Sequence, residues 1–91
     1  MEWKLFAHLR DAAGAETVSV DVETPGTVEA ALAALVEAEP ALRAELFEDG
    51  DLADHIHLLV DGEDAFTERE GLATEVAADT ELALFPPVSG G

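Results

Sequence analysis

Hydrophobic and polar residues alternate most regularly over residues 16–22. The three valines in this segment share one face of an extended chain and the polar residues share the other, which is the pattern of a half-buried β-strand. Residues 3–7 alternate in part and carry two aromatic side chains, so they also predict a strand. We expect these two strands to pair, with residues 8–13 between them as a short helical turn that ends at Gly14.

A helical period replaces this alternation after a turn at residues 24–26. Thr27 is a suitable N-cap, and Glu29 places a negative charge at the positive end of the helix dipole. Pro40 interrupts the pattern, so residues 41–47 predict a second, shorter helix. The first helix carries a single apolar stripe, formed by Val28, Ala31, Leu32, Leu35 and Val36.

The second half of the chain returns to strand patterns. Residues 56–60 predict a strand, residues 61–62 a type I′ hairpin turn, and residues 65–66 the start of a short returning strand. Residues 67–79 are too polar and irregular to assign, and residues 81–85 predict the last strand. Two paired strands, a helix, further short strands and a final strand together predict an α+β fold.

The chain ends in a stiff segment followed by two glycines. Proline has no N–H to give to a sheet and holds φ near −65°, so Pro86 and Pro87 should end the last strand and direct the tail outward. Glycine has no Cβ, so Gly90 and Gly91 could pass along a narrow channel of a partner. A glycine-rich end also occurs where nothing holds a chain, but the rigid segment before it favours a directed exit. We expect one domain over residues 1–87 and a flexible tail over residues 88–91.

The last eight residues, Leu-Phe-Pro-Pro-Val-Ser-Gly-Gly, resemble a known C-terminal signature. It is that of the small, sulfur-carrying (MoaD-like) subunit of molybdopterin synthase and of the ubiquitin-like small archaeal modifier proteins. The resemblance extends to residues 3–7, 27–28 and 60–63, and so covers essentially the whole chain. It departs from the family in two turns, with Asp61 where Asn is frequent and Ala78 where Gly is usual. The resemblance implies a β-grasp (ubiquitin-like) fold, a mixed sheet packed against one main helix.

The same resemblance implies a chemical role for the Gly91 carboxylate. An adenylating enzyme of the ubiquitin-activating (MoeB-like) type would use Mg-ATP to convert it to an acyl-adenylate. Sulfur would then give a thiocarboxylate for molybdopterin biosynthesis or tRNA thiolation, or a target lysine would form an isopeptide bond. The implied partners are this enzyme and either the large subunit of molybdopterin synthase or target proteins with acceptor lysines. The chain would bind no cofactor, would be a monomer when free, and would be a carrier rather than an enzyme outside a synthase complex.

This interpretation assigns roles to specific residues. Lys4, the single lysine, is the candidate acceptor for conjugation to the chain itself, and we expect chains built on it to be rare because it lies in a predicted strand. Leu5, Leu59 and Leu84 could add an apolar patch on the sheet, although strand leucines more often belong to the core. The partner should contact Phe85, Pro86, Pro87, Val88, Ser89 and Gly90.

The charge of the chain narrows the classes of partner. It has 21 Asp and Glu against 4 Lys and Arg, a net charge of −17. Such a surface excludes nucleic acid, because affinity for phosphate depends on Lys and Arg. Hydrophobic residues make up 48% of the chain and the acids are scattered, which predicts a folded domain with a halophilic surface rather than a disordered tail or a one-faced mimic of DNA. No apolar run approaches the ~18 residues that span a membrane, and residues 1–4 lack the features of a signal peptide, so we expect a cytoplasmic protein.

The sequence motifs of other catalytic, phosphate-binding and metal sites are absent or incomplete. The chain has no cysteine, so a partner must supply any catalytic thiol, and it has neither a phosphate-binding loop nor a nucleophile elbow. His55 and His57 would share one face of a strand beside Asp54, but a metal site needs further ligands and His8 is the only other histidine. We therefore expect no metal site there, and a solvated loop at residues 48–51. The alternative to a carrier is an acidic, non-catalytic adaptor that binds a partner through its sheet.

The charge predicts that stability depends on salt. At molar ionic strength the Debye length is about 3 Å, so the mutual repulsion of the acids is largely screened, whereas in dilute buffer it weakens the folded state. We expect the midpoint of thermal unfolding, followed by circular dichroism, to fall from molar to millimolar KCl. A midpoint that stays constant would contradict the halophilic interpretation.

Overall fold

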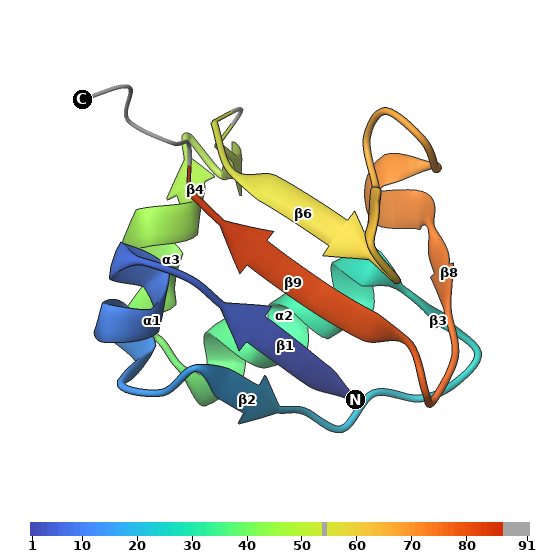
Figure 1. The fold of residues 1–91 in the computed structure, drawn as a ribbon, viewed down its shortest axis with the longest axis horizontal. Helices are drawn as coiled ribbons and strands as arrows, with labels where there is room; N and C mark the ends of the chain where they lie inside the picture. The colour runs from blue at the N-terminus through green and yellow to red at the C-terminus, as the bar shows by residue number, and fades with distance from the viewer. Residues whose placement is uncertain (54, 87–91) are drawn as a thin grey trace.

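A mixed sheet with the last strand at its centre organises the fold (Figure 1). The structure is a computed structural model that describes residues 1–53 and 55–86. The sheet has five strands in the order β2-β1-β9-β6-β7. They are β1 (Glu2–Leu5), β2 (Thr17–Ser19), β6 (His57–Val60), β7 (Glu63–Asp64) and β9 (Glu81–Phe85). Strand β9 runs parallel to β1 and antiparallel to β6, which is the arrangement expected of a β-grasp fold.

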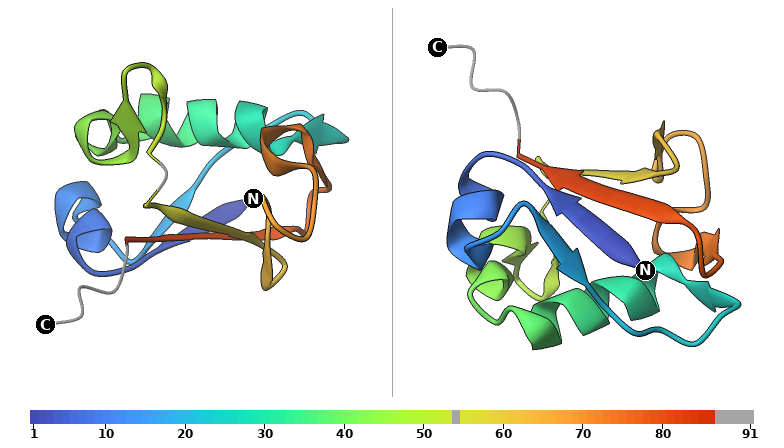
Figure 2. Two further views of the ribbon diagram at one scale, coloured as in Figure 1. Left: turned by 90° about the horizontal axis from the view of Figure 1, so that it is seen from above. Right: turned by 60° about the horizontal axis from the view of Figure 1, so that its bottom comes forward.

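The alternation of each strand divides the sheet into a buried and an open face. Trp3, Leu82 and Leu84 point into the core, whereas Lys4 and Ala83 face the other side. Helix α2 (Val28–Ala38) crosses the buried face, and in the described residues no helix covers the open one (Figure 2). The open face of the sheet therefore remains available to a partner.

Helix α2 begins and packs as its sequence predicts. The Thr27 side chain accepts a hydrogen bond from the N–H of Ala30 at 3.3 Å, and the predicted apolar stripe is buried along its whole length. Trp3 lies in the sheet, and its indole Nε1–H donates to the carbonyl of Ala31 at 3.1 Å. Because both groups are buried, this bond satisfies two polar atoms and fixes the helix over β1.

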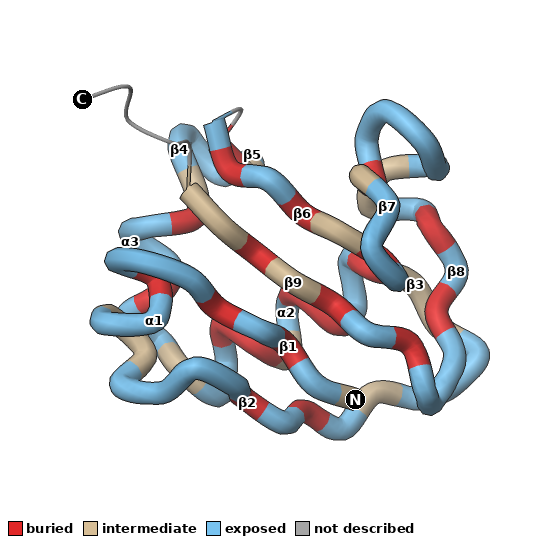
Figure 3. Tube along the Cα trace, viewed as in Figure 1, coloured by how far each residue is buried: buried red, intermediate tan, exposed pale blue. Residues whose placement is uncertain are grey.

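The remaining helices are short. Helix α1 (His8–Ala13) ends at Gly14, whose φ of 79° is the left-handed conformation that glycine adopts without strain, as predicted. Helix α3 (Leu42–Leu46) follows Pro40 and buries both of its leucines. Figure 3 shows which residues of the strands and helices are buried and which are exposed. The core consists of Trp3, Leu5, Leu9, Val18, Val20, Val28, Ala31, Leu32, Leu35, Val36, Leu42, Leu46, Ala53, Ile56, Leu58, Val60, Ala65, Val76, Leu82 and Leu84.

Several predicted boundaries were wrong. Residues 48–51 are exposed to solvent as expected, but they belong to a tight hairpin of β4 (Phe47–Glu48) and β5 (Asp51–Leu52) rather than to an irregular loop, because the two residues of its turn, Asp49 and Gly50, adopt φ of 53° and 86°. The unassigned residues 67–79 contain the 3₁₀ helix η1 (Gly71–Ala73) and β8 (Glu75–Val76), and β8 pairs with β3 (Gly26–Thr27). The β3–β8 pair joins segments that are distant in the sequence, so local patterns did not indicate it.

The predicted hairpin turn is correct, but its returning strand begins earlier than expected. Asp61 and Gly62 have φ of 50° and 84°, as a type I′ turn requires. A two-residue turn leaves no loop residues, so β7 starts at Glu63 rather than at Ala65. The strand expected over residues 3–7 likewise ends at Leu5, since Ala7 has a φ of 54°, and the strand expected over residues 16–22 is regular only over residues 17–19.

Asp61 links this turn to the start of the last strand, which predicts the effect of changing it. Its N–H donates to the carbonyl of Glu81 at 2.8 Å, and its Oδ1 accepts from the N–H of Glu81 at 2.9 Å. Asp61→Ala loses the second bond and tolerates positive φ poorly, so we expect a loss of about 1–3 kcal/mol of unfolding free energy. Asp61→Asn keeps both properties and is the matched control, expected within about 0.5 kcal/mol of the wild type. Equal unfolding midpoints for the two variants in denaturant titrations would contradict this role.

Candidate functional site at the end of the last strand

The last strand ends where the prolines predict. Strand β9 reaches Phe85, and Pro86 is outside it and half-buried. The expectations for Pro87, Val88, Ser89, Gly90 and Gly91 concern residues that lie outside the described part of the chain. The candidate site is therefore built from the residues around Phe85.

Phe85 is the centre of a small aromatic cluster on the open face of the sheet. Its ring meets the edge of Phe6 with centroids 5.7 Å apart, and it stacks on the His57 ring at 5.4 Å. His57 is the register partner of Phe85 across the β6–β9 pair, and Phe6 directly follows β1. We call Phe6, His57 and Phe85 the exit patch, because they surround the point at which the chain leaves the sheet.

The exit patch offers apolar surface to a partner. Phe6 is 46% exposed, Phe85 is half-buried, and aromatic side chains in such positions contribute strongly when a partner covers them. Leu59 and Ala83, which pair across β6 and β9, continue the patch as half-buried residues. Of the leucines considered from the sequence, only Leu59 lies at this surface, because Leu5 and Leu84 point into the core.

Lys4 lies on the same face of the sheet. It occupies β1 as predicted, pairs with Ala83 on one side and Thr17 on the other, and its side chain is exposed. The other amine of the chain, the N-terminal ammonium of Met1, donates to the carbonyl of Val20 at 3.3 Å. Lys4 is therefore the more accessible amine of the two.

The histidines do not form the shared face that a continuous strand would give them. Strand β6 begins only at His57, so His55 stands in the preceding turn and is exposed. His57 Nδ1 lies 4.0 Å from Asp64 Oδ2, and His8 Nε2 lies 3.4 Å from Glu45 Oε2. Within residues 1–53 and 55–86, no three His, Cys, Asp or Glu residues are grouped so that they could hold a metal ion.

Acidic side chains lie on the open face at the end of β1 and β9 that is remote from the exit patch. Glu2 and Glu81 lie side by side at the start of β1 and β9, and both are exposed. Arg10 approaches Glu16 at 3.8 Å, and Arg69 pairs with Glu63 through two hydrogen bonds. Exposed ion pairs of this kind contribute little to the stability of the fold. The acidic residues therefore act mainly through the negative electrostatic field of the surface.

Comparison with known proteins assigns this architecture to a family. The sequence profile of the ThiS family matches residues 3–91. The chain belongs to the ThiS family. Small archaeal modifier protein 1 of Haloferax volcanii is 55% identical over 92 residues, and the alignment covers 100% of each chain.

Solved structures agree with this membership of the ThiS family. The crystal structure of small archaeal modifier protein 1 from Haloferax volcanii matches with a TM-score of 0.90 at 55% identity, over 100% of this chain and 98% of that chain. A chain of the crystal structure of the Amycolatopsis orientalis BexX/CysO complex matches with a TM-score of 0.81 at 25% identity, over 99% of this chain and 98% of that one. The family resemblance and the β-grasp fold are thus confirmed.

Two further observations concern the class of protein. The Haloferax relative is a modifier protein by name, in agreement with the expectation of a carrier rather than an enzyme. In the described part of the chain, every helix is too short or too polar to cross a membrane.

Sequence reasoning missed two of the three residues of the exit patch. His57 was considered only as a metal ligand, and Phe6 only as part of a strand. The register of β6 against β9 brings His57 to Phe85, and the parallel pairing of β1 and β9 brings Phe6 there. The usable signal was the position of both residues one place from an end of a predicted strand.

Proposed function

We propose that this chain is a ubiquitin-like protein modifier and sulfur carrier whose Gly91 carboxylate is the reactive group. The observation that carries the proposal is the place of β9, a strand held on both sides that ends beside an exposed aromatic patch. The likeness to small archaeal modifier protein 1 over the whole of both chains supports it.

Activation must precede any transfer. A terminal carboxylate is ionised at neutral pH and is a poor acyl donor. In the proposed first step, a carboxylate oxygen of Gly91 attacks the α-phosphorus of ATP held with Mg²⁺ by a partner enzyme of the ubiquitin-activating type. Pyrophosphate leaves, and the product is an acyl-adenylate.

The adenylate then has two outcomes. The terminal sulfur of a partner persulfide can attack the acyl carbon and displace AMP, which leaves an acyl disulfide. A second partner thiolate then attacks the partner's sulfur in that bond, forms a disulfide with it and releases the Gly91 thiocarboxylate. Alternatively, the amine of a target lysine attacks the same carbon, and an isopeptide bond replaces the bond to AMP. Because the chain has no cysteine, the partner supplies all the sulfur atoms.

The fold suits this chemistry because it separates a rigid domain from the reactive end. An extended chain spans about 3.3–3.6 Å per residue, so residues 88–91 reach about 14 Å into a partner site while the domain stays outside. The exit patch would then lie against the partner at the mouth of that site. The BexX/CysO complex is an example of a similar chain crystallised together with a second protein.

The rival function is an acidic adaptor that binds through its sheet. It would use the same exit patch, so exposed aromatic residues do not distinguish the two. The identity of residue 91 does, because an adaptor keeps its affinity when the last glycine is removed. Intact-mass analysis of the protein from its native cells would show a free, thiolated or conjugated end.

The tail itself provides the direct test. If the channel of the activating enzyme admits backbone but no side chain, Gly90→Val should reduce ATP–pyrophosphate exchange at least a hundredfold, and deletion of Gly91 should abolish it. Ser89→Ala is the matched control, expected within about tenfold because a hydroxyl offers one hydrogen bond of about 0.5–1.5 kcal/mol. Thermal unfolding at high salt checks that each variant is folded. Wild-type exchange by both glycine variants would replace the carrier with the adaptor.

The exit patch predicts a second effect, on recognition rather than chemistry. Phe85→Ala removes the ring that joins Phe6 and His57, so we expect the KM of the activating enzyme for this chain to rise about tenfold or more while kcat stays within about threefold. Glu37→Ala, on the exposed side of α2 away from the sheet, is the control and should change neither. An unchanged KM for a folded Phe85→Ala variant would remove the patch from the interface.

A further inference from the structure

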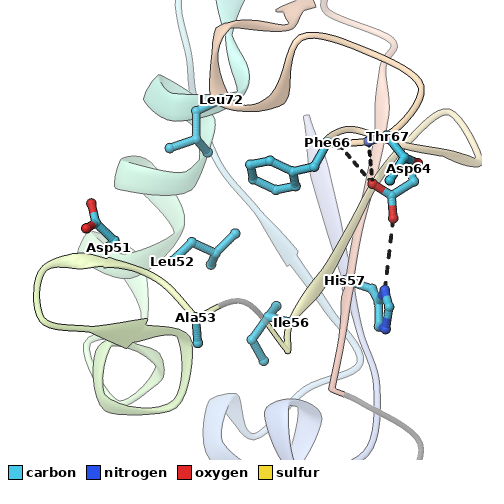
Figure 4. Close-up of a pocket in the computed structure, with 9 residues that line it drawn as sticks. All are labelled: Asp51, Leu52, Ala53, Ile56, His57, Asp64, Phe66, Thr67 and Leu72. Atoms are coloured by element: carbon cyan, nitrogen blue, oxygen red, sulfur yellow. Dashed lines mark hydrogen bonds and ion pairs between the residues drawn. The ribbon is translucent and has the colours of Figure 1, made fainter.

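An apolar cleft opens next to the exit patch, between the β4–β5 hairpin and the loop after β7 (Figure 4). Its volume is about 490 Å³. The floor and walls are formed by Leu52, Ala53, Ile56, Phe66 and Leu72, and a carboxylate stands at each side, Asp51 on β5 and Asp64 on β7. The proposed chemistry of the tail does not use this cleft.

Phe66 is presented to the cleft by an ordered loop. Its side chain is 50% exposed, so about half of its apolar surface is available to a ligand. Asp64 Oδ1 accepts hydrogen bonds from the N–H groups of Phe66 at 2.8 Å and of Thr67 at 3.1 Å. Glu68 Oε2 accepts from the Asp64 N–H at 3.0 Å, which closes the loop from the other side.

Gly71 also shapes this wall. A Cβ at this position would lie 3.1 Å from Phe66 Cδ1, and its φ of 62° disfavours other residues. The backbone of η1 therefore approaches the ring closely on one side, while the other side of the ring faces the cleft, opposite Leu52 (Figure 4). The geometry keeps Phe66 out of the core and in one position.

The charges around the cleft indicate what it binds. Asp64 Oδ1 is occupied by the two backbone N–H groups, but Oδ2 has only His57 Nδ1 at 4.0 Å, which is longer than a hydrogen bond. This oxygen can therefore accept directly from a ligand. A cation with an aliphatic stem matches an apolar floor with a carboxylate beside it, since the stem packs on the floor and the head reaches Asp64.

We propose that this cleft binds an extended peptide segment of a partner protein in which a leucine-sized apolar side chain stands next to arginine or lysine. The apolar side chain packs between Phe66 and Leu52, and the basic head group binds Asp64. Because His57 both lines the cleft and stacks on Phe85, a partner on the exit patch can extend into the cleft. The site is independent of the chemistry at residue 91.

The probe for this site is the peptide acetyl-Leu-Arg-Leu-Arg-amide, added to the ¹⁵N-labelled full chain. In 1 M KCl the Debye length is about 3 Å, so general attraction of a basic peptide to the acidic surface is suppressed and direct contacts remain. We expect amide shifts in ¹H–¹⁵N spectra at Leu52, Phe66 and Leu72, which saturate with one dissociation constant. The peptide acetyl-Leu-Glu-Leu-Glu-amide should give no saturable shift.

Two pairs of variants separate the apolar and the ionic contribution. Phe66→Ala should weaken binding of the arginine peptide at least tenfold, whereas Phe66→Leu, which keeps apolar area, should stay within about threefold. Asp64→Asn keeps the Oδ1 acceptor of the loop but removes the charge, so we expect about three- to tenfold weaker binding. Asp11→Asn, an equal change of charge on the exposed surface of α1, should have no effect. Circular dichroism shows whether each variant is folded.

Four outcomes would overturn the proposal. Shifts confined to Phe6 and Phe85 would place the peptide on the exit patch, and equal loss in Asp64→Asn and Asp11→Asn would show unspecific attraction. Equal binding of the glutamate peptide would remove the basic head group from the recognition. If the amide shift of Phe66 changes with protein concentration when no peptide is present, the occupant of the cleft is a second copy of the chain. None of these results bears on pyrophosphate exchange, so the cleft and the function of the tail are tested separately.

Discussion

The pairing of β9 with both β1 and β6 is the constraint on which the rest of the structure depends. It joins the two ends of the sequence, since β1 opens the chain and β9 follows seventy-odd residues later. Leu82 and Leu84 are almost fully buried beneath α2, so the strand is held by packing as well as by backbone hydrogen bonds. The chain that follows Phe85 therefore starts from a fixed point of the sheet.

The one-sided packing of the sheet follows from the same arrangement. Trp3 and the apolar stripe of α2 fill one face, and the hydrogen bond from Trp3 to Ala31 sets the position of the helix. The other face is left with short or partly polar side chains, and its aromatic residues gather where β9 ends. The surface that a partner can use is thus the consequence of where the core lies.

The acidic surface gives these apolar regions their selectivity. A net charge of −17 repels acidic surfaces and nucleic acid, so a partner of the exit patch and the cleft must bring basic or neutral groups. Asp64 shows how one residue serves both purposes, because one carboxylate oxygen orders the loop that presents Phe66, and the other lies toward His57 at the side of the cleft (Figure 4). Structure and recognition are therefore linked at this position.

The sequence alone determined the elements whose signals are local. The helix from Thr27, the caps at Thr27 and Gly14, the turn at Asp61 and the extent of β9 are as predicted, because capping, positive φ and alternation depend on neighbouring residues. Phe85 and Pro86 were assigned to the site for the same reason, since proline has no N–H to donate to a neighbouring strand and so ends a central strand.

Only the tertiary structure decided which side chains meet. Phe6 directly follows β1, whereas His57 and Phe85 lie in β6 and β9, so their cluster depends on the register of β1 and β6 against β9. The β3–β8 pair and the cleft around Phe66 likewise join segments whose local patterns are irregular. Burial against distant residues selects these contacts, and a periodicity of two or 3.6 residues carries no information about a partner strand far away in the chain.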